Sequence, residues 1–117
     1  MTVLLVANIA AALISAGSSV AGTLRPGLAL PAGEPITTGT NLYARAYSAR
    51  AVPLGLATAL LLLTGAPGVA VWPMLVVAGL AQAGDSAIGL LQRNRGMAFG
   101  AGAFAVLHLA SACRLAR

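Results

Sequence analysis

Charged residues are scarce in this chain, and lysine is missing altogether. Only 8% of the 117 residues are charged and 59% are hydrophobic, whereas a soluble domain carries about a quarter charged residues. A chain so poor in charge cannot cover a surface that faces water, so we predict an integral membrane protein. The seven basic residues are all arginines and form no cluster with aromatic residues, so we expect no nucleic-acid partner.

Cysteine and histidine occur once each, as Cys113 and His108. A single cysteine excludes an internal disulfide, and one thiol with one imidazole does not make a structural zinc site. The sequence also contains no CxxC and no cofactor motif, so we expect neither a metal nor a cofactor. Any chemistry that the chain performs is therefore expected to rest on its own side chains.

Long apolar runs, by contrast, are abundant. A helix that crosses the hydrocarbon core takes about 20 apolar residues, and four segments fit, at 3–22, 43–64, 69–91 and 97–115. The links after the second and third segments (GAPG and QRNRG) are short, which places neighbouring helices antiparallel. The sequence therefore predicts an all-α fold, a single domain over 1–117 that forms an antiparallel bundle of four transmembrane helices.

The N-terminal part of the chain leaves two further interpretations. Ser19-Val20-Ala21 resembles a signal-peptide cleavage site, but no basic region precedes the apolar run, which favours a retained helix. The connection 23–42 is long, rich in Gly, Pro and Thr, and carries Glu34. We expect this loop to act as a lid.

The arginines indicate the topology. Because helix ends alternate between the two sides, one side holds Arg25, Arg45, Arg50, Arg93 and Arg95, and the other holds Arg114 and Arg117. The positive-inside rule places the larger group in the cytoplasm. We therefore expect a multi-pass protein of a bacterial inner (plasma) membrane with both termini outside, although the difference shrinks if Arg45 and Arg50 lie within the membrane.

Each predicted helix has one polar face. The residues on these faces repeat at helical spacing: Asn8, Ser15 and Ser19; then Tyr43, Tyr47 and Arg50; then Gln82, Asp85 and Ser86; and finally Gly100, Phe104, His108 and Ser111. Serines and glycines at such positions are typical of close helix packing. The spacing of Gly96 and Gly100 also offers a means of homodimerisation.

Charged side chains inside a membrane need a different explanation, because each costs roughly 2.5–3.5 kcal/mol at the bilayer centre. Asp85 is expected about 9 Å from the end of its helix and Arg50 about 10 Å from the start of its own, on the same side. The two opposite charges are thus predicted to pair, with Tyr43 and Tyr47 nearer the mouth of the bundle and His108 deeper, at about 16 Å.

One stretch of the sequence resembles a known family. The string YARAYSARAVPLGLATALLL, followed by the Asp85 of QAGDSAIGL and by His108, is similar to small four-helix bacterial membrane proteins of unknown function that are distantly DoxX-like. The resemblance implies a four-helix fold in which Arg45, Arg50, Asp85 and His108 are shared features. DoxX-like proteins are discussed as partners of redox systems, but the absence of CxxC here argues against that role.

These patterns favour a small membrane enzyme that performs acid–base chemistry on a lipophilic molecule, such as isomerisation, cyclisation or epoxide opening. Asp85 is expected to be the base or acid, Arg50 to hold it or to stabilise an oxyanion, and Tyr47 or His108 to transfer a proton. The residues expected to bind the substrate are Tyr43, Asn8, Gln82 and Ser15. Two alternatives remain: a non-catalytic subunit or scaffold, in which the charges form an internal clamp, and a proton-coupled transporter that uses Asp85.

Overall fold

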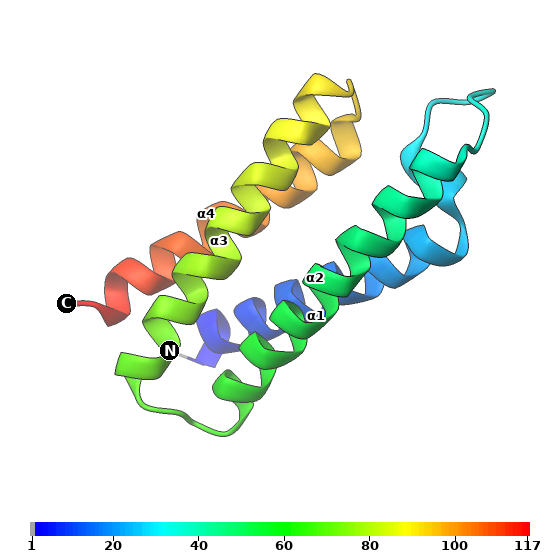
Figure 1. Ribbon diagram of the computed structural model, residues 1–117. Helices are drawn as coiled ribbons and strands as arrows, with labels where there is room; N and C mark the ends of the chain where they lie inside the picture. The colour runs from blue at the N-terminus through cyan, green and yellow to red at the C-terminus, as the bar shows by residue number, and fades with distance from the viewer. Residues whose placement is uncertain (1) are drawn as a thin grey trace.

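The computed structural model describes residues 2–117, and these form helices joined by short connections. The elements are α1 (Thr2–Leu24), the 3-10 helix η1 (Pro26–Ala29), α2 (Thr38–Leu63), α3 (Gly68–Leu91) and α4 (Arg95–Leu115). Figure 1 shows the four long helices as two antiparallel pairs, α1 with α2 and α3 with α4. The predicted all-α, four-helix architecture is confirmed.

The four long helices are all long enough and apolar enough to cross a membrane. The shortest, α4, has 21 residues, which corresponds to about 31 Å of helix and matches a hydrocarbon core of about 30 Å. Large apolar side chains are exposed on every helix, among them Leu13, Leu60, Leu80 and Val106. Such a surface suits lipid rather than water, so the chain is a multi-pass membrane protein.

Glycines hold the two helices of each pair in close contact. A Cβ atom at Gly55 would lie 2.6 Å from the carbonyl oxygen of Ala12, and one at Gly89 would lie 2.6 Å from the backbone nitrogen of Ala98. No side chain fits at these distances, so the helix backbones touch at these points. Gly100 differs, since a Cβ there would meet nothing within 4 Å. We refer to α1–α2 as the first hairpin and to α3–α4 as the second hairpin.

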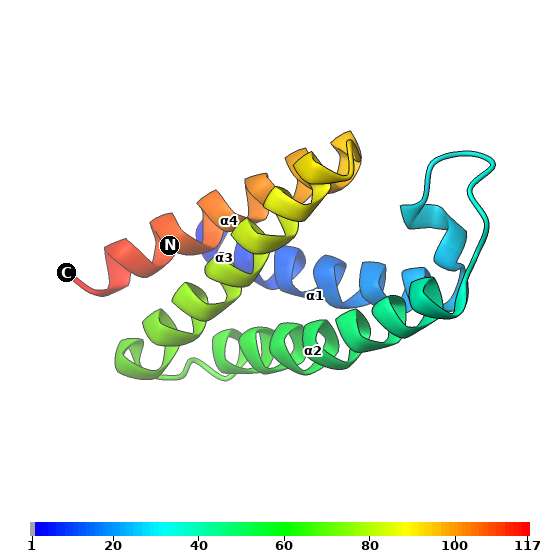
Figure 2. The ribbon, with the colours of Figure 1, turned by 45° about the horizontal axis from the view of Figure 1, so that its top comes forward.

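The two hairpins share an apolar cluster at one end and diverge toward the other. The cluster consists of Leu62, Val71, Leu75 and Ala112 and lies near the α2–α3 turn. At the opposite end, the start of α2 and the α3–α4 turn lie apart in both ribbon views (Figures 1 and 2). Gly65 in the α2–α3 turn has a φ of 66°, which glycine adopts without strain. The hairpins are thus joined by a tight turn at their apolar end.

Helix α2 begins at Thr38 and not at the predicted Tyr43. The side chain of Thr37 accepts a hydrogen bond from the backbone N–H of Thr40, and the side chain of Thr40 accepts one from the backbone N–H of Thr37. This capping box satisfies N–H groups that the first turn of a helix leaves unpaired. The apolar pattern of the sequence does not reveal the first turn of α2, because that turn is polar.

Candidate functional site

Asp85 is the buried charge at the centre of the site. Only 4% of the residue is exposed. Arg50 donates from Nη2 to Oδ1 of Asp85 at 3.0 Å, and Tyr47 donates from its hydroxyl to Oδ2 at 3.1 Å. Both donors come from α2, and together they give each carboxylate oxygen a partner, as a buried charge requires. The predicted pairing of Asp85 with Arg50 is present in the structure.

Because α2 begins earlier than predicted, Arg50 lies farther from the start of its helix than predicted. Its contact with Asp85 is nevertheless present. Arg50 lies about 18 Å along α2 from its start, not about 10 Å. Side chains in a helix lean toward its N-terminus. The guanidinium of Arg50 therefore reaches back toward the start of α2, while the carboxylate of Asp85 leans away from the end of α3. The two groups meet between the levels of their backbones.

Two tyrosines precede Arg50 on the same face of α2. The rings of Tyr43 and Tyr47 are stacked, with centroids 6.1 Å apart and planes 21° apart. The Cζ atom of Arg50 lies 5.4 Å from the centroid of the Tyr47 ring, within the range of a cation–π contact. Tyr43 is 46% exposed, and the side chain of Arg50 is 52% exposed. This face thus leads from the outside of the bundle to the buried carboxylate.

His108 is held in a second polar contact, between α1 and α4. The side-chain nitrogen of Asn8 donates to the carbonyl oxygen of Leu4 at 2.7 Å and to Oγ of Ser111 at 2.8 Å. The Oδ1 atom of Asn8 lies 2.8 Å from Nδ1 of His108. Because Oδ1 only accepts, Nδ1 carries the proton of this hydrogen bond. In a neutral imidazole the other nitrogen, Nε2, then carries a lone pair.

A third contact joins α1 to α3. Gln82 donates from Nε2 to Oγ of Ser15, and the Ser15 hydroxyl donates to the carbonyl oxygen of Ala11 at 2.8 Å. Both residues were predicted to face the interior. Since each hydroxyl or amide here already has a protein partner, they hold the hairpins together as well as facing the site.

The three contacts surround one small cavity. Its lining includes Ser15, Tyr47, Arg50, Gln82, Asp85 and His108. Its volume is about 20 Å³, enough for about one water molecule and far below the roughly 300–1,000 Å³ of a small-molecule site. The predicted intramembrane pocket for a lipophilic molecule is therefore not open beside Asp85. The cavity is small because Ala12, Gly55 and Ala78 let the helix backbones close around it.

The loop that was expected to act as a lid lies beyond the end of the first hairpin (Figure 2). It contains η1 and the exposed Glu34. Every residue that lines the cavity belongs to one of the four long helices, and none comes from this loop. A closing role for the loop remains a prediction.

Thr58 is a residue of the site that was not predicted from the sequence. Thr58 is 1% exposed, lines the cavity, and donates from its hydroxyl to the carbonyl oxygen of Leu54 at 2.7 Å. Within the apolar string LATALLLL a single threonine is inconspicuous. Its spacing was the available signal, because Arg50, Leu54 and Thr58 follow one another at intervals of four and so continue the tyrosine face inward.

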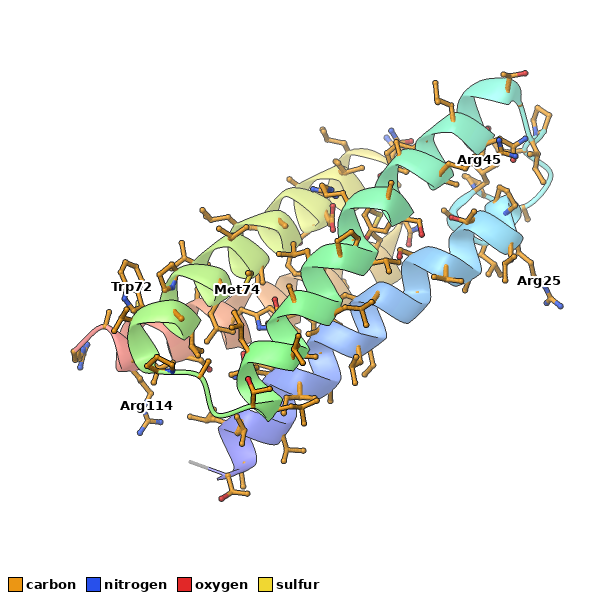
Figure 3. All side chains as sticks on the ribbon, turned by 60° about the horizontal axis from the view of Figure 1, so that its bottom comes forward. Arg25, Arg45, Trp72, Met74 and Arg114 are labelled. Atoms are coloured by element: carbon orange, nitrogen blue, oxygen red, sulfur yellow. The ribbon has the colours of Figure 1, made fainter. Side chains whose placement is uncertain are left out.

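The remaining candidates lie outside the site. Arg45 is exposed on α2 (Figure 3) and does not line the cavity. Cys113 is exposed near the end of α4. Among residues 2–117, no group of His, Cys, Asp and Glu side chains is placed to hold a metal ion.

Comparison with protein families, with curated proteins and with solved structures finds no match for this chain. The resemblance to DoxX-like proteins therefore remains a prediction.

Proposed function

We propose that the chain is a small membrane enzyme that performs acid–base chemistry on a lipophilic small molecule without a cofactor. The observation that carries the proposal is that four chemically complementary groups border one cavity. They are the carboxylate of Asp85, the phenol of Tyr47, the guanidinium of Arg50 and the imidazole of His108. A carboxylate buried inside the bundle is an expensive way to stabilise a fold, which favours a chemical role for Asp85.

The size of the cavity selects among the reactions that these groups suit. Isomerisation and cyclisation need the whole reacting part of the substrate to lie among the catalytic groups. Hydrolytic opening of an epoxide needs one water molecule on one side of the substrate, and the cavity of about 20 Å³ holds about one water. We therefore place epoxide opening first.

Each group then has a defined task. Asp85 accepts a proton from the water as the water oxygen bonds to an epoxide carbon, while His108 orients the water through Nε2. The carbon–oxygen bond of the ring breaks, and Arg50 stabilises the oxyanion that develops. Tyr47 donates its phenol proton to that oxygen, which yields the diol. Tyr47 regains a proton from Asp85 across their 3.1 Å contact, so every group returns to its starting state.

The substrate approaches from the lipid, between the hairpins. Only the water has to fit inside, because Arg50 lines the cavity and is also half exposed, and Tyr43 is exposed beside it on the same face of α2. A lipophilic epoxide lying against the two stacked tyrosines presents its oxygen to Arg50 and Tyr47. Attack opposite the leaving oxygen requires the epoxide carbon to lie between the water at Asp85 and the oxygen that Arg50 and Tyr47 bind.

A non-catalytic subunit or scaffold is the second candidate, and the tight packing favours it. Close glycine contacts within each hairpin and a cavity no larger than a water molecule are also expected if Asp85 and Arg50 only hold the bundle together. In that case Asp85 and Arg50 fix the angle between the hairpins, and the apolar outer surface binds a larger membrane partner. A proton-coupled transporter is disfavoured, since Arg50 already neutralises the carboxylate that a cation would need.

We also propose that the chain resides in a bacterial inner membrane with both termini outside. The helix bounds place Arg25, Arg93 and Arg95 at the end where the hairpins diverge, and Arg114 and Arg117 at the other. The positive-inside rule assigns the first end to the cytoplasm.

The decisive experiment is turnover in ¹⁸O-labelled water. The purified chain in lipid nanodiscs is incubated with aliphatic and terpenoid epoxides, and labelled diols are detected by mass spectrometry. Asp85→Asn is expected to lower turnover at least about 100-fold while the helical circular-dichroism spectrum is retained. The matched control is Glu34→Gln, because Glu34 is the chain's other carboxylate and lies outside the site. Absence of labelled diol with every epoxide would leave the scaffold as the better proposal.

A further inference from the structure

A second and larger cavity lies toward the end of the molecule that carries the α2–α3 turn and the chain termini. Its volume is about 430 Å³, within the range of roughly 300–1,000 Å³ for small-molecule sites. Helices α1, α3 and α4 and the end of α2 all contribute to it. Most of its walls are aliphatic, including Leu5, Leu61, Leu62, Val71, Leu75 and Leu115. Such walls suit a hydrocarbon chain.

Two hydrogen-bond donors on α4 border the same cavity. Ser111 and Arg114 are three residues apart, so they lie on one face of the helix. Ser111 is 6% exposed and accepts a hydrogen bond from Asn8 at 2.8 Å. Within residues 2–117 the Ser111 hydroxyl donates to no acceptor, so its proton is available to a ligand.

Arg114 supplies a positive charge to this site. Figure 3 shows its side chain extending from α4 on the side of the α2–α3 turn. In the described part of the chain the one ion pair is that of Arg50 with Asp85, so no protein carboxylate neutralises Arg114. Guanidinium and hydroxyl donors one turn apart are suited to an oxyanion, since charge-assisted hydrogen bonds are about twice as strong as neutral ones.

We propose that this cavity binds an amphiphile with one hydrocarbon chain inserted and an anionic carboxylate or phosphate head. The chain lies against the leucines, and the head bonds to Arg114 and Ser111. A cationic head would be repelled by Arg114, and a neutral one would leave the guanidinium without a counter-charge. The anionic head can belong to a free fatty acid or to a membrane phospholipid, which share this chemistry. The proposal is independent of the catalytic site, because it rests on different residues and requires no turnover.

The test is equilibrium binding of radiolabelled palmitate to the chain in phosphatidylcholine nanodiscs, with binding to empty nanodiscs subtracted. Hexadecanol and hexadecyltrimethylammonium serve as probes with the same chain and a neutral or positive head. Arg114→Gln is compared with Arg117→Gln, which alters an arginine that does not line the cavity. Nanodiscs that contain phosphatidylglycerol show whether a phospholipid head competes with palmitate, and so which source the site prefers.

A second pair of variants tests the cavity itself. Gly68 lines it, and a Cβ at Gly68 meets nothing within 4 Å, so Gly68→Leu is expected to narrow the cavity. Gly84 also has open space but does not line the cavity, so Gly84→Leu is the matched control.

The expected result is saturable palmitate binding that Arg114→Gln weakens about tenfold or more and that Gly68→Leu also weakens, with both control variants unchanged. Competition by phosphatidylglycerol supports the proposal with a phospholipid as the ligand. Equal binding of all three probes would contradict the proposal that the ligand has an anionic head. Palmitate binding that is insensitive to both Arg114→Gln and Gly68→Leu would overturn the site.

Discussion

Asn8 of α1 and His108 of α4 are joined by a 2.8 Å hydrogen bond, and the two residues are 2% and 1% exposed. This contact stands between the two cavities, because His108 lines the cavity of Asp85 and Asn8 lines the larger one. Asn8 also binds Ser111, so one amide group organises both sites. We therefore expect substitutions of Asn8 or His108 to lower the free energy of unfolding.

Replacing Asn8 tests this directly. Asn8→Ala leaves Nδ1 of His108 without its acceptor in a buried position, and we expect a loss of about 1–3 kcal/mol in the free energy of unfolding. Asn8→Leu with His108→Leu removes both partners and is expected to recover part of that loss. Thermal unfolding in mild detergent, followed by circular dichroism, measures both. A double variant whose loss of stability equals the sum of the losses of Asn8→Leu and His108→Leu made singly would mean that the two residues are not coupled.

Substitutions of the two partners of the Asp85–Arg50 pair are expected to lower the unfolding temperature by different amounts. Arg50→Met leaves a buried carboxylate without its counter-charge, whereas Asp85→Asn leaves a guanidinium that is already half exposed. A charge buried without a partner is the costlier defect. We therefore expect Arg50→Met to lower the unfolding temperature more than Asp85→Asn does. The reverse order in a thermal scan would show that Arg50 is buried in the membrane-bound protein.

Gly55 should tolerate no side chain. A Cβ there would lie 2.6 Å from the carbonyl oxygen of Ala12, and the backbone cannot yield as a flexible side chain does. Gly55→Ala is expected to cost about 1–3 kcal/mol of stability through overpacking. Gly100→Ala is the matched control, since open space surrounds that position. Equal melting temperatures for the two variants would contradict the close approach of α1 and α2.

Substitution of Tyr47 is expected to affect catalysis while the fold is retained. Tyr47→Phe keeps the ring against Arg50 and removes the hydroxyl that donates to Asp85. If Tyr47 is the proton donor, epoxide turnover should fall about 100- to 10,000-fold. Diol formation in labelled water is the measurement, with Tyr43→Phe as the control for a tyrosine that lacks the Asp85 hydrogen bond. Equal effects of the two variants would assign both tyrosines to substrate binding.

Much of this arrangement could be predicted from the spacing of residues along the helices. Tyr43, Tyr47 and Arg50 repeat at the helical period, and the polar face of α3 does the same, so pairing of Arg50 with Asp85 followed from an antiparallel bundle. Polar residues in an apolar helix are a strong indication of its inner face, because a polar side chain that faces lipid is costly.

The size of the interior could not be predicted in the same way. Alanine and glycine on an inner face are compatible with a hollow or with close packing, and the choice depends on how far the helices approach. That distance is set by single contacts, such as Gly55 on Ala12 and Gly79 on Leu109, which no pattern in one helix reveals. The larger cavity could not be predicted either, because its walls come from all four helices.

The α2–α3 turn has a consequence for biogenesis. Among residues 2–117, every hydrogen bond that crosses from one hairpin to the other joins two side chains. Each hairpin keeps its own backbone hydrogen bonds and its own glycine contacts. We therefore expect the two hairpins to insert into the bilayer separately. Co-expressed as fragments 1–66 and 67–117, they are expected to find each other in the bilayer and to restore the contact between Arg50 and Asp85.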